Sequence, residues 1–212
     1  MWITPNTPGT RVPSHRTSDF GETYAIDFVM IQDNDSFKKP YQRSFLEYLF
    51  QGLALDDFYG WGQTIYSPID GEVIEIKNDI AERNPVNIFK DFSNTLKVTR
   101  DFTQGSVPLA SITGNYVLLK CSDDIYALFA HLQKGSIIVK PGQRIRVNQP
   151  LGQLGHSGNS TMPHLHMQFM SSSNYKVAQG IPFVFREYEV KRNRKWEKVC
   201  NSIPTAKDII RH

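Results

Sequence analysis

The stretch from Gly155 to Phe169 joins a glycine- and serine-rich loop to an apolar run that carries two histidines. His164 and His166 are separated by one residue, and residues i and i+2 of a β-strand point to the same face. Two imidazoles side by side suit a metal site or an acid–base pair. Two half-exposed histidines on an edge strand would have the same spacing, so other residues must distinguish these interpretations.

A second unusual feature is an aspartate within an apolar run. Residues 24–30, YAIDFVM, are apolar and rich in β-forming residues except at Asp27, which predicts a buried strand. A buried carboxylate is costly unless it is paired, hydrogen-bonded or bound to a metal. A structural salt bridge, backbone hydrogen bonds and a metal ion each satisfy that requirement.

Two further histidines complete a set of candidate groups. His131 ends the apolar run at residues 126–132, and His15 follows an irregular, proline-rich lead-in at residues 1–14. Catalytic zinc takes three protein ligands, usually His, Asp or Glu, and leaves a fourth position for water. The sequence offers more candidate groups than the three ligands that zinc needs. The additional groups have a use, because attack of a zinc-bound water on an amide also needs a proton acceptor and an oxyanion stabiliser. The pattern therefore favours hydrolysis assisted by Zn²⁺.

The elements that must position these side chains are mostly short strands. We expect strands at residues 24–30, 72–77, 115–121, 125–131, 144–147 and 181–190. A Ser-Asp-Asp turn makes the third and fourth of these a hairpin. A short helix is expected within residues 44–55, and residues 79–112 show no periodicity and are expected to form a loop. Many short strands with little helix indicate a mostly β domain.

The domain organisation predicted from this pattern is a single domain over residues 1–212. Its core covers about residues 15–78 and 113–190, with insertions at about 32–66 and 79–112. At 212 residues, with 40% hydrophobic and 21% charged residues, the chain suits one ordinary globular domain. The net charge of +3 is mild and indicates a solvated basic face, so no nucleic-acid partner is expected.

The sequence contains no recognisable membrane or disulfide signal. No apolar run approaches the roughly 20 residues of a transmembrane helix, and the N-terminus lacks the regions of a signal peptide. As given, the chain carries no export signal. Cys121 and Cys200 form neither a disulfide framework nor a zinc-type pair, and we expect thiols packed in the core.

Several segments together resemble the lysostaphin-type (LytM-like) zinc metallopeptidases. They are residues 67–73 (SPIDGEV), residues 126–132 with Lys134, residues 139–143 (VKPGQ), residues 150–152 (PLG), and residues 158–161 (GNST) leading into His164-Leu165-His166. A lone His-x-His is a weak signal. Its position 33 residues after the histidine of an Ala-His-Leu makes the combination specific.

The resemblance implies an antiparallel β-sandwich or barrel-like sheet of the duplicated hybrid motif type. It also implies a zinc endopeptidase that acts on peptidoglycan stem peptides or crossbridges. His15, Asp27 and His166 would then be the zinc ligands, while His131 and His164 would act on the water and the oxyanion. A peptidoglycan substrate implies a location in the cell envelope. A cytoplasmic peptidase with another peptide target remains an alternative, because no export signal is present.

The sequence departs from the commoner family pattern at the aspartate, which usually follows the first histidine by four residues. Asp19 has that spacing, but it lies in a polar turn where a solvated carboxylate is unremarkable. We therefore prefer Asp27, which lies in an apolar strand. His156 is expected to be an exposed loop residue, and His212 has no assigned role.

Three other classes of protein are weaker interpretations of the same sequence. An inactive binding or activator module would have lost ligands, whereas every candidate position is filled here. A biotinyl or lipoyl carrier domain needs a modifiable lysine on an exposed hairpin, and the sequence has no such turn. A sugar-transport phosphocarrier would use one phosphorylated histidine and would not need the combined pattern.

Overall fold

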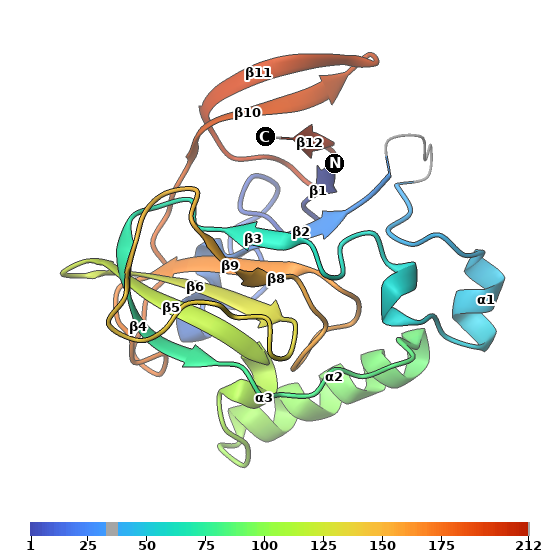
Figure 1. The fold of residues 1–212 in the computed structure, drawn as a ribbon, viewed down its shortest axis with the longest axis horizontal. Helices are drawn as coiled ribbons and strands as arrows, with labels where there is room; N and C mark the ends of the chain where they lie inside the picture. The colour runs from blue at the N-terminus through green and yellow to red at the C-terminus, as the bar shows by residue number, and fades with distance from the viewer. Residues whose placement is uncertain (33–37, 212) are drawn as a thin grey trace.

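The computed structural model describes residues 1–32 and 38–211, and its architecture is mostly antiparallel β, as predicted (Figure 1). A ten-stranded sheet has the order β11-β10-β12-β1-β2-β9-β6-β5-β4-β7, and β3 pairs with β8 in a second sheet. The strands are β1 Trp2–Ile3, β2 Ile26–Met30, β3 Thr64–Tyr66, β4 Gly71–Lys77, β5 Asn115–Ser122, β6 Ile125–Leu132, β7 Arg144–Ile145, β8 Pro150–Gln153, β9 Leu165–Met170, β10 Phe185–Arg192, β11 Lys195–Ser202 and β12 Ile210–Arg211. The helices are η1 Asp19–Tyr24, α1 Phe45–Phe50, η2 Leu55–Asp57, α2 Ile88–Thr103 and α3 Ala110–Thr113.

Strands β5 and β6 form the predicted hairpin, and β6 pairs on its other side with β9. Alternation along β9 sends Leu165, Met167 and Phe169 into the main hydrophobic core, which lies between this sheet and the β3–β8 pair. His166 and Gln168 occupy the alternate positions and are also buried. The strand pattern thus places polar side chains on the face opposite the core.

Both ends of the chain contain strands that the sequence analysis did not predict. The N-terminal lead-in contains β1, in which Trp2 pairs with both Met30 of β2 and Ile210 of β12. The basic C-terminal residues form β11 and β12 in the same sheet. Cys121 is half-buried and Cys200 is exposed, so the expectation of core thiols was wrong for Cys200.

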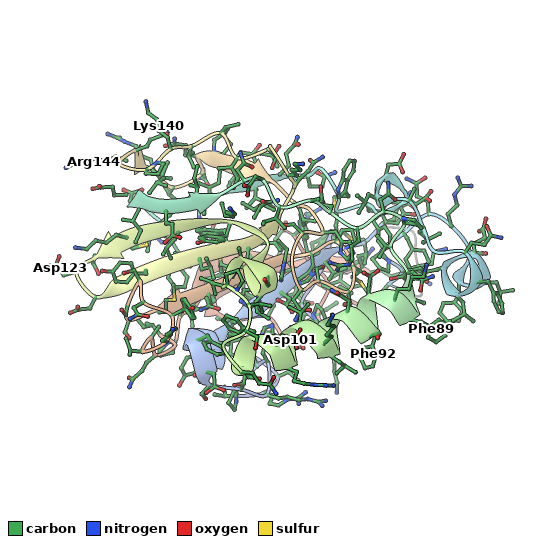
Figure 2. All side chains as sticks on the ribbon, turned by 90° about the horizontal axis from the view of Figure 1, so that it is seen from below. Phe89, Phe92, Asp101, Asp123, Lys140 and Arg144 are labelled. Atoms are coloured by element: carbon green, nitrogen blue, oxygen red, sulfur yellow. The ribbon has the colours of Figure 1, made fainter. Side chains whose placement is uncertain are left out.

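Residues 79–112, expected to be a loop, contain the longest helix of the described chain. The side chain of Asn87 caps α2 by accepting a hydrogen bond from the backbone of Lys90. Asp91 and Phe102 are the buried residues of this helix, whereas Phe89 and Phe92 are exposed and point away from the molecule (Figure 2). The prediction failed because this helix buries an aspartate and exposes phenylalanines.

The helix expected within residues 44–55 is present in the structure. Helix α1 lies within the predicted residues 44–55, with a capping box between Ser44 and Glu47. It lies near the beginning of α2 (Figure 1). No helix within the described residues is long and apolar enough to cross a bilayer.

Candidate metal centre and active site

Adjacent strands β2 and β9 bring the central pair of the site together. Asp27 faces His166 in the antiparallel register, and the Asp27 Oδ1 to His166 Nδ1 distance is 3.0 Å. His15, from the segment before η1, places its Nε2 3.0 Å from Asp27 Oδ2. The three side chains offer ligand atoms that all lie within 4.8 Å of one another. Asp27 and His166 are only 4% and 7% exposed.

Each of these two histidines has its other ring nitrogen fixed by a protein acceptor. His15 Nδ1 lies 3.0 Å from Ser14 Oγ, whose own proton is donated to the Glu22 carbonyl. His166 Nε2 lies 2.9 Å from Gln168 Oε1. These contacts assign the ring protons to His15 Nδ1 and His166 Nε2.

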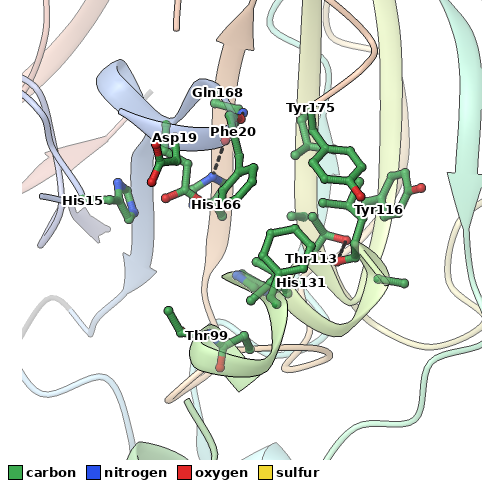
Figure 3. Close-up of a pocket in the computed structure, with 18 of the residues that line it drawn as sticks. His15, Asp19, Phe20, Thr99, Thr113, Tyr116, His131, His166, Gln168 and Tyr175 are labelled. Carbon is green, nitrogen blue, oxygen red and sulfur yellow. Dashed lines mark hydrogen bonds between the residues drawn. The ribbon is translucent and has the colours of Figure 1, made fainter. Parts of the chain in front are cut away.

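The Gln168 amide orientation follows from one further contact. Its Nε2 donates to the Phe20 carbonyl at 2.9 Å, which leaves Oε1 as the atom that faces His166 (Figure 3). Gln168 was not predicted from the sequence, although it lies two positions after His166 and therefore on the same face of β9. Extending the i, i+2 argument by one step would have found it.

The consequence is a convergence of lone pairs. In the neutral rings, His15 Nε2 and His166 Nδ1 are unprotonated and can only accept. They face the Asp27 carboxylate, which is also an acceptor, from two sides. Acceptors held about 3 Å apart repel one another unless a cation or protons lie between them. The donor set of two imidazole nitrogens and one carboxylate is one that Zn²⁺ accepts. The residues present therefore fit a zinc site.

Asp27 also receives contacts that fix its carboxylate. Asn6 donates from Nδ2 to Asp27 Oδ2 at 2.7 Å, and the Asp27 amide donates to the Asn6 carbonyl at 2.9 Å. Asn6 lies in the lead-in that was expected to be irregular, and no sequence signal marked it.

Protonation of the metal-free site follows from these contacts. Burial by itself raises the pKa of Asp27, but electrostatic interaction with His15 and His164 and hydrogen bonding with His15 and His166 bring it well below its ordinary value. Burial lowers the pKa of His166, but hydrogen bonding to Asp27 and the charge of Asp27 outweigh that effect and raise it to about 9. In the metal-free protein a proton therefore occupies part of the space between these acceptors.

His131 and His164 form a second pair beside this cluster. Their ring centroids are 4.6 Å apart, and His164 Nε2 lies 3.8 Å from Asp27 Oδ1. His131 Nδ1 donates to the Ser157 carbonyl at 2.9 Å, and His164 Nδ1 donates to the Met162 carbonyl at 2.8 Å. Each ring therefore keeps Nε2 unprotonated.

Burial lowers the pKa of both members of this pair, most strongly for His131. Neutral imidazoles near neutral pH are able to accept a proton. His131 also has a φ of 62°, a left-handed conformation that is uncommon for residues other than glycine. Strained backbone of this kind concentrates at functional sites.

The loop between β8 and β9 is packed closely against the start of β5. Ser157 Oγ donates to the Leu132 carbonyl at 2.7 Å and accepts from the Asn115 amide at 2.9 Å. Gly114 and Gly158 have φ values of 63° and 69°, and a Cβ on Gly158 would lie 2.2 Å from the Gly114 nitrogen. Only glycine fits at this crossing.

His156, predicted to be exposed, is fully buried at 0% exposure. Its Nδ1 lies 3.0 Å from Ser160 Oγ, and its Nε2 lies 3.4 Å from Arg83 Nη2. The prediction was wrong because the segment that includes Arg83 and α2 covers this loop, and no local sequence pattern indicates that cover. His212 and residues 33–37 lie outside the described residues.

A pocket of about 900 Å³ opens over the cluster and extends toward α2. His15, His131 and His166 lie at one part of it, and Thr99, Tyr116 and Tyr175 line its remainder (Figure 3). Asp19 also lines this pocket, but it is exposed and is not part of the three-residue ligand cluster. The geometry thus favours Asp27 over Asp19 as the carboxylate of the cluster.

Part of this chain matches a known peptidase family. The sequence model of Peptidase family M23 matches residues 101–178, which include His131, His164 and His166. The predicted resemblance to the lysostaphin-type peptidases is therefore confirmed. The curated relatives of this chain described next are named as endopeptidases, which are hydrolases.

Two curated relatives illustrate the match. Peptidoglycan DD-endopeptidase ShyC of Vibrio cholerae is 38% identical over 63 residues, which are 30% of this chain and 14% of the relative. Glycyl-glycine endopeptidase ALE-1 of Staphylococcus capitis is 33% identical over 100 residues, which are 44% of this chain and 27% of the relative. The matches thus span less than a third of these relatives' lengths.

Similar solved structures include a variant catalytic domain of the prophage-encoded M23 protein EnpA from Enterococcus faecalis. It is 16% identical, with a TM-score of 0.43 and coverage of 85% of this chain and 87% of that chain. The catalytic domain of lysostaphin from Staphylococcus simulans is 17% identical, with a TM-score of 0.40 and coverage of 85% of each chain.

Proposed function

We propose that this chain is a zinc-dependent endopeptidase that hydrolyses peptide bonds in peptidoglycan stem peptides or crossbridges. The observation that carries the proposal is the convergence of His15 Nε2, Asp27 and His166 Nδ1, with both outer ring nitrogens committed to protein acceptors. The names of the peptidoglycan endopeptidases related to this chain support the substrate class. That substrate would place the site of action in the cell envelope.

His15, Asp27 and His166 would hold the ion. Bound zinc lowers the pKa of water toward about 7 and polarises a carbonyl. The charge of two neutral imidazoles and one carboxylate leaves the site net positive, which favours that effect.

His131 and His164 would move the proton. Either Nε2 is free to accept a proton from the attacking water, because both Nδ1 atoms already donate to carbonyl groups. Once protonated, Nε2 becomes a donor and can stabilise the oxyanion or protonate the leaving amine. The lowered pKa of both rings keeps them neutral before that step.

The experiment combines metal analysis with cleavage of purified peptidoglycan fragments by the wild type and by Asp27→Ala, His166→Ala and Asp19→Ala. We expect about one zinc per chain and new amino termini for the wild type and Asp19→Ala, with both lost in the other two variants. Zinc binding without cleavage of any peptide fragment would refute the enzyme and favour a binding module. An absence of zinc from the wild type after incubation with excess metal would refute the zinc site itself.

A further inference from the structure

A largely buried polar network connects the second insertion to His164. It consists of Arg83 before α2, Asp91 in the first turn of α2, and His156 and Ser160 in the loop before β9. Asp91 and Ser160 are 1% and 0% exposed. Burying an ionised carboxylate is costly, and such groups are retained where their hydrogen bonds are complete.

Arg83 is the centre of this network. Its Nε donates to Asp91 Oδ1, its Nη1 donates to the Gly158 carbonyl at 2.7 Å, and its Nη2 donates to the Ser160 carbonyl. Asp91 is held in turn by the Asn87 amide, which donates to Oδ2 at 2.7 Å. One guanidinium thus fixes the loop backbone at two places and ties it to the start of α2.

Ser160 carries the connection to the active site. Its Oγ lies 2.6 Å from the Met162 carbonyl, and it must donate this bond because a carbonyl only accepts. The hydroxyl has no second proton, so the Nδ1 atoms of His156 and His164, at 3.0 and 3.1 Å, must both donate to it. The Nε2 of His156 lies 3.4 Å from Arg83 Nη2, which can only donate, and 3.6 Å from Asp91 Oδ1.

The consequence for His164 is a fixed tautomer. Its Nδ1 faces two acceptors, Ser160 Oγ and the Met162 carbonyl, so the ring proton resides on Nδ1. Nε2 is then unprotonated and faces Asp27. This is the state in which His164 can take a proton from water.

We propose that Arg83, Asp91, His156 and Ser160 are positioning residues that hold His164 in its Nδ1-protonated tautomer and in contact with the metal cluster. In this interpretation α2 supports the active-site loop, in addition to lining the pocket. The kinetic consequence rests on the proposed peptidase function, whereas the tautomer does not.

The test compares Ser160→Ala, Arg83→Met and Arg83→Lys with the wild type. Tyr48→Phe is the matched control, because Tyr48 Oη contacts the carbonyl of Thr161 in the same loop but lies outside the network. Histidine ¹⁵N chemical shifts in the zinc-loaded protein report the tautomer of His164. Zinc content, kcat and KM are measured on the same samples.

We expect Ser160→Ala and Arg83→Met to shift His164 toward a mixture of tautomers and to lower kcat about 10- to 100-fold. KM and zinc content should remain at wild-type values, Arg83→Lys should recover part of kcat, and Tyr48→Phe should match the wild type. A pure Nδ1-protonated His164 in both Ser160→Ala and Arg83→Met would overturn the proposal. If the wild type cleaves no peptide, the chemical shifts still decide the tautomer, so the two proposals fail separately.

Discussion

The two halves of the site are built by different means. The metal half lies mainly on paired strands, because Asp27 and His166 face each other in the register of β2 and β9. The proton-transfer half depends on loop contacts, because the Nδ1 atoms of His131 and His164 donate to carbonyls of the loop before β9. The sheet therefore sets the ligand geometry directly, whereas the second half requires the loop to be held in place.

The largest effect should come from the metal half. Replacing Asp27 or His166 with alanine removes a ligand atom from the cluster, and we expect kcat/KM to fall on the order of 10⁴-fold with loss of the ion. Circular dichroism should show a folded protein, because strand pairing is a backbone property. Normal zinc content in both variants would contradict this assignment.

The second-largest effect should distinguish the proton-transfer half of the site from the metal half. His131→Ala and His164→Ala should each lower kcat about 10²- to 10⁴-fold while zinc content stays at one per chain, because neither side chain is a ligand. Elemental analysis and steady-state kinetics on the same preparations measure this. Loss of zinc from His164→Ala would show that the two halves are not distinct.

The third effect concerns pH. Because Asp27 outweighs burial and raises the pKa of His166 to about 9, His166 carries a proton below that pH in the metal-free protein. Zinc must displace this proton, so its apparent affinity should fall about tenfold for each pH unit below about 9. Chelator competition at several pH values measures the slope, and an affinity independent of pH would contradict a single displaced proton.

The smallest effect should come from the support of His166. Gln168→Leu removes the acceptor that fixes the His166 Nε2 proton, and we expect zinc affinity to fall about 10- to 100-fold. Gln168→Glu keeps an acceptor at this position and should retain more affinity than the leucine variant. Equal affinities for the two variants would assign Gln168 a packing role only.

Strand periodicity in the sequence predicts which of the clustered side chains share a face. His164 and His166 were recognised by their spacing, and Asp27 by its conflict with an apolar strand. Gln168 follows from the same periodicity but was overlooked. These residues are predictable because a strand fixes which side chains share a face.

The remaining parts depend on contacts between distant segments, which local patterns do not encode. Asn6 meets Asp27 because β1 joins the sheet beside β2. His156 is buried because Arg83 and α2 cover its loop. Helix α2 was missed since Asp91 on its buried side satisfies Arg83 and so breaks the apolar pattern expected of a packed helix.

The most direct test of the metal centre is anomalous diffraction from crystals of the zinc-incubated protein, measured on both sides of the zinc edge. We expect one ion, bound by His15 through Nε2, by Asp27 through its carboxylate and by His166 through Nδ1. His131 and His164 should lie beside the ion without binding it. An ion bound through Asp19, or no ion among His15, Asp27 and His166, would contradict the assignment of these three ligands.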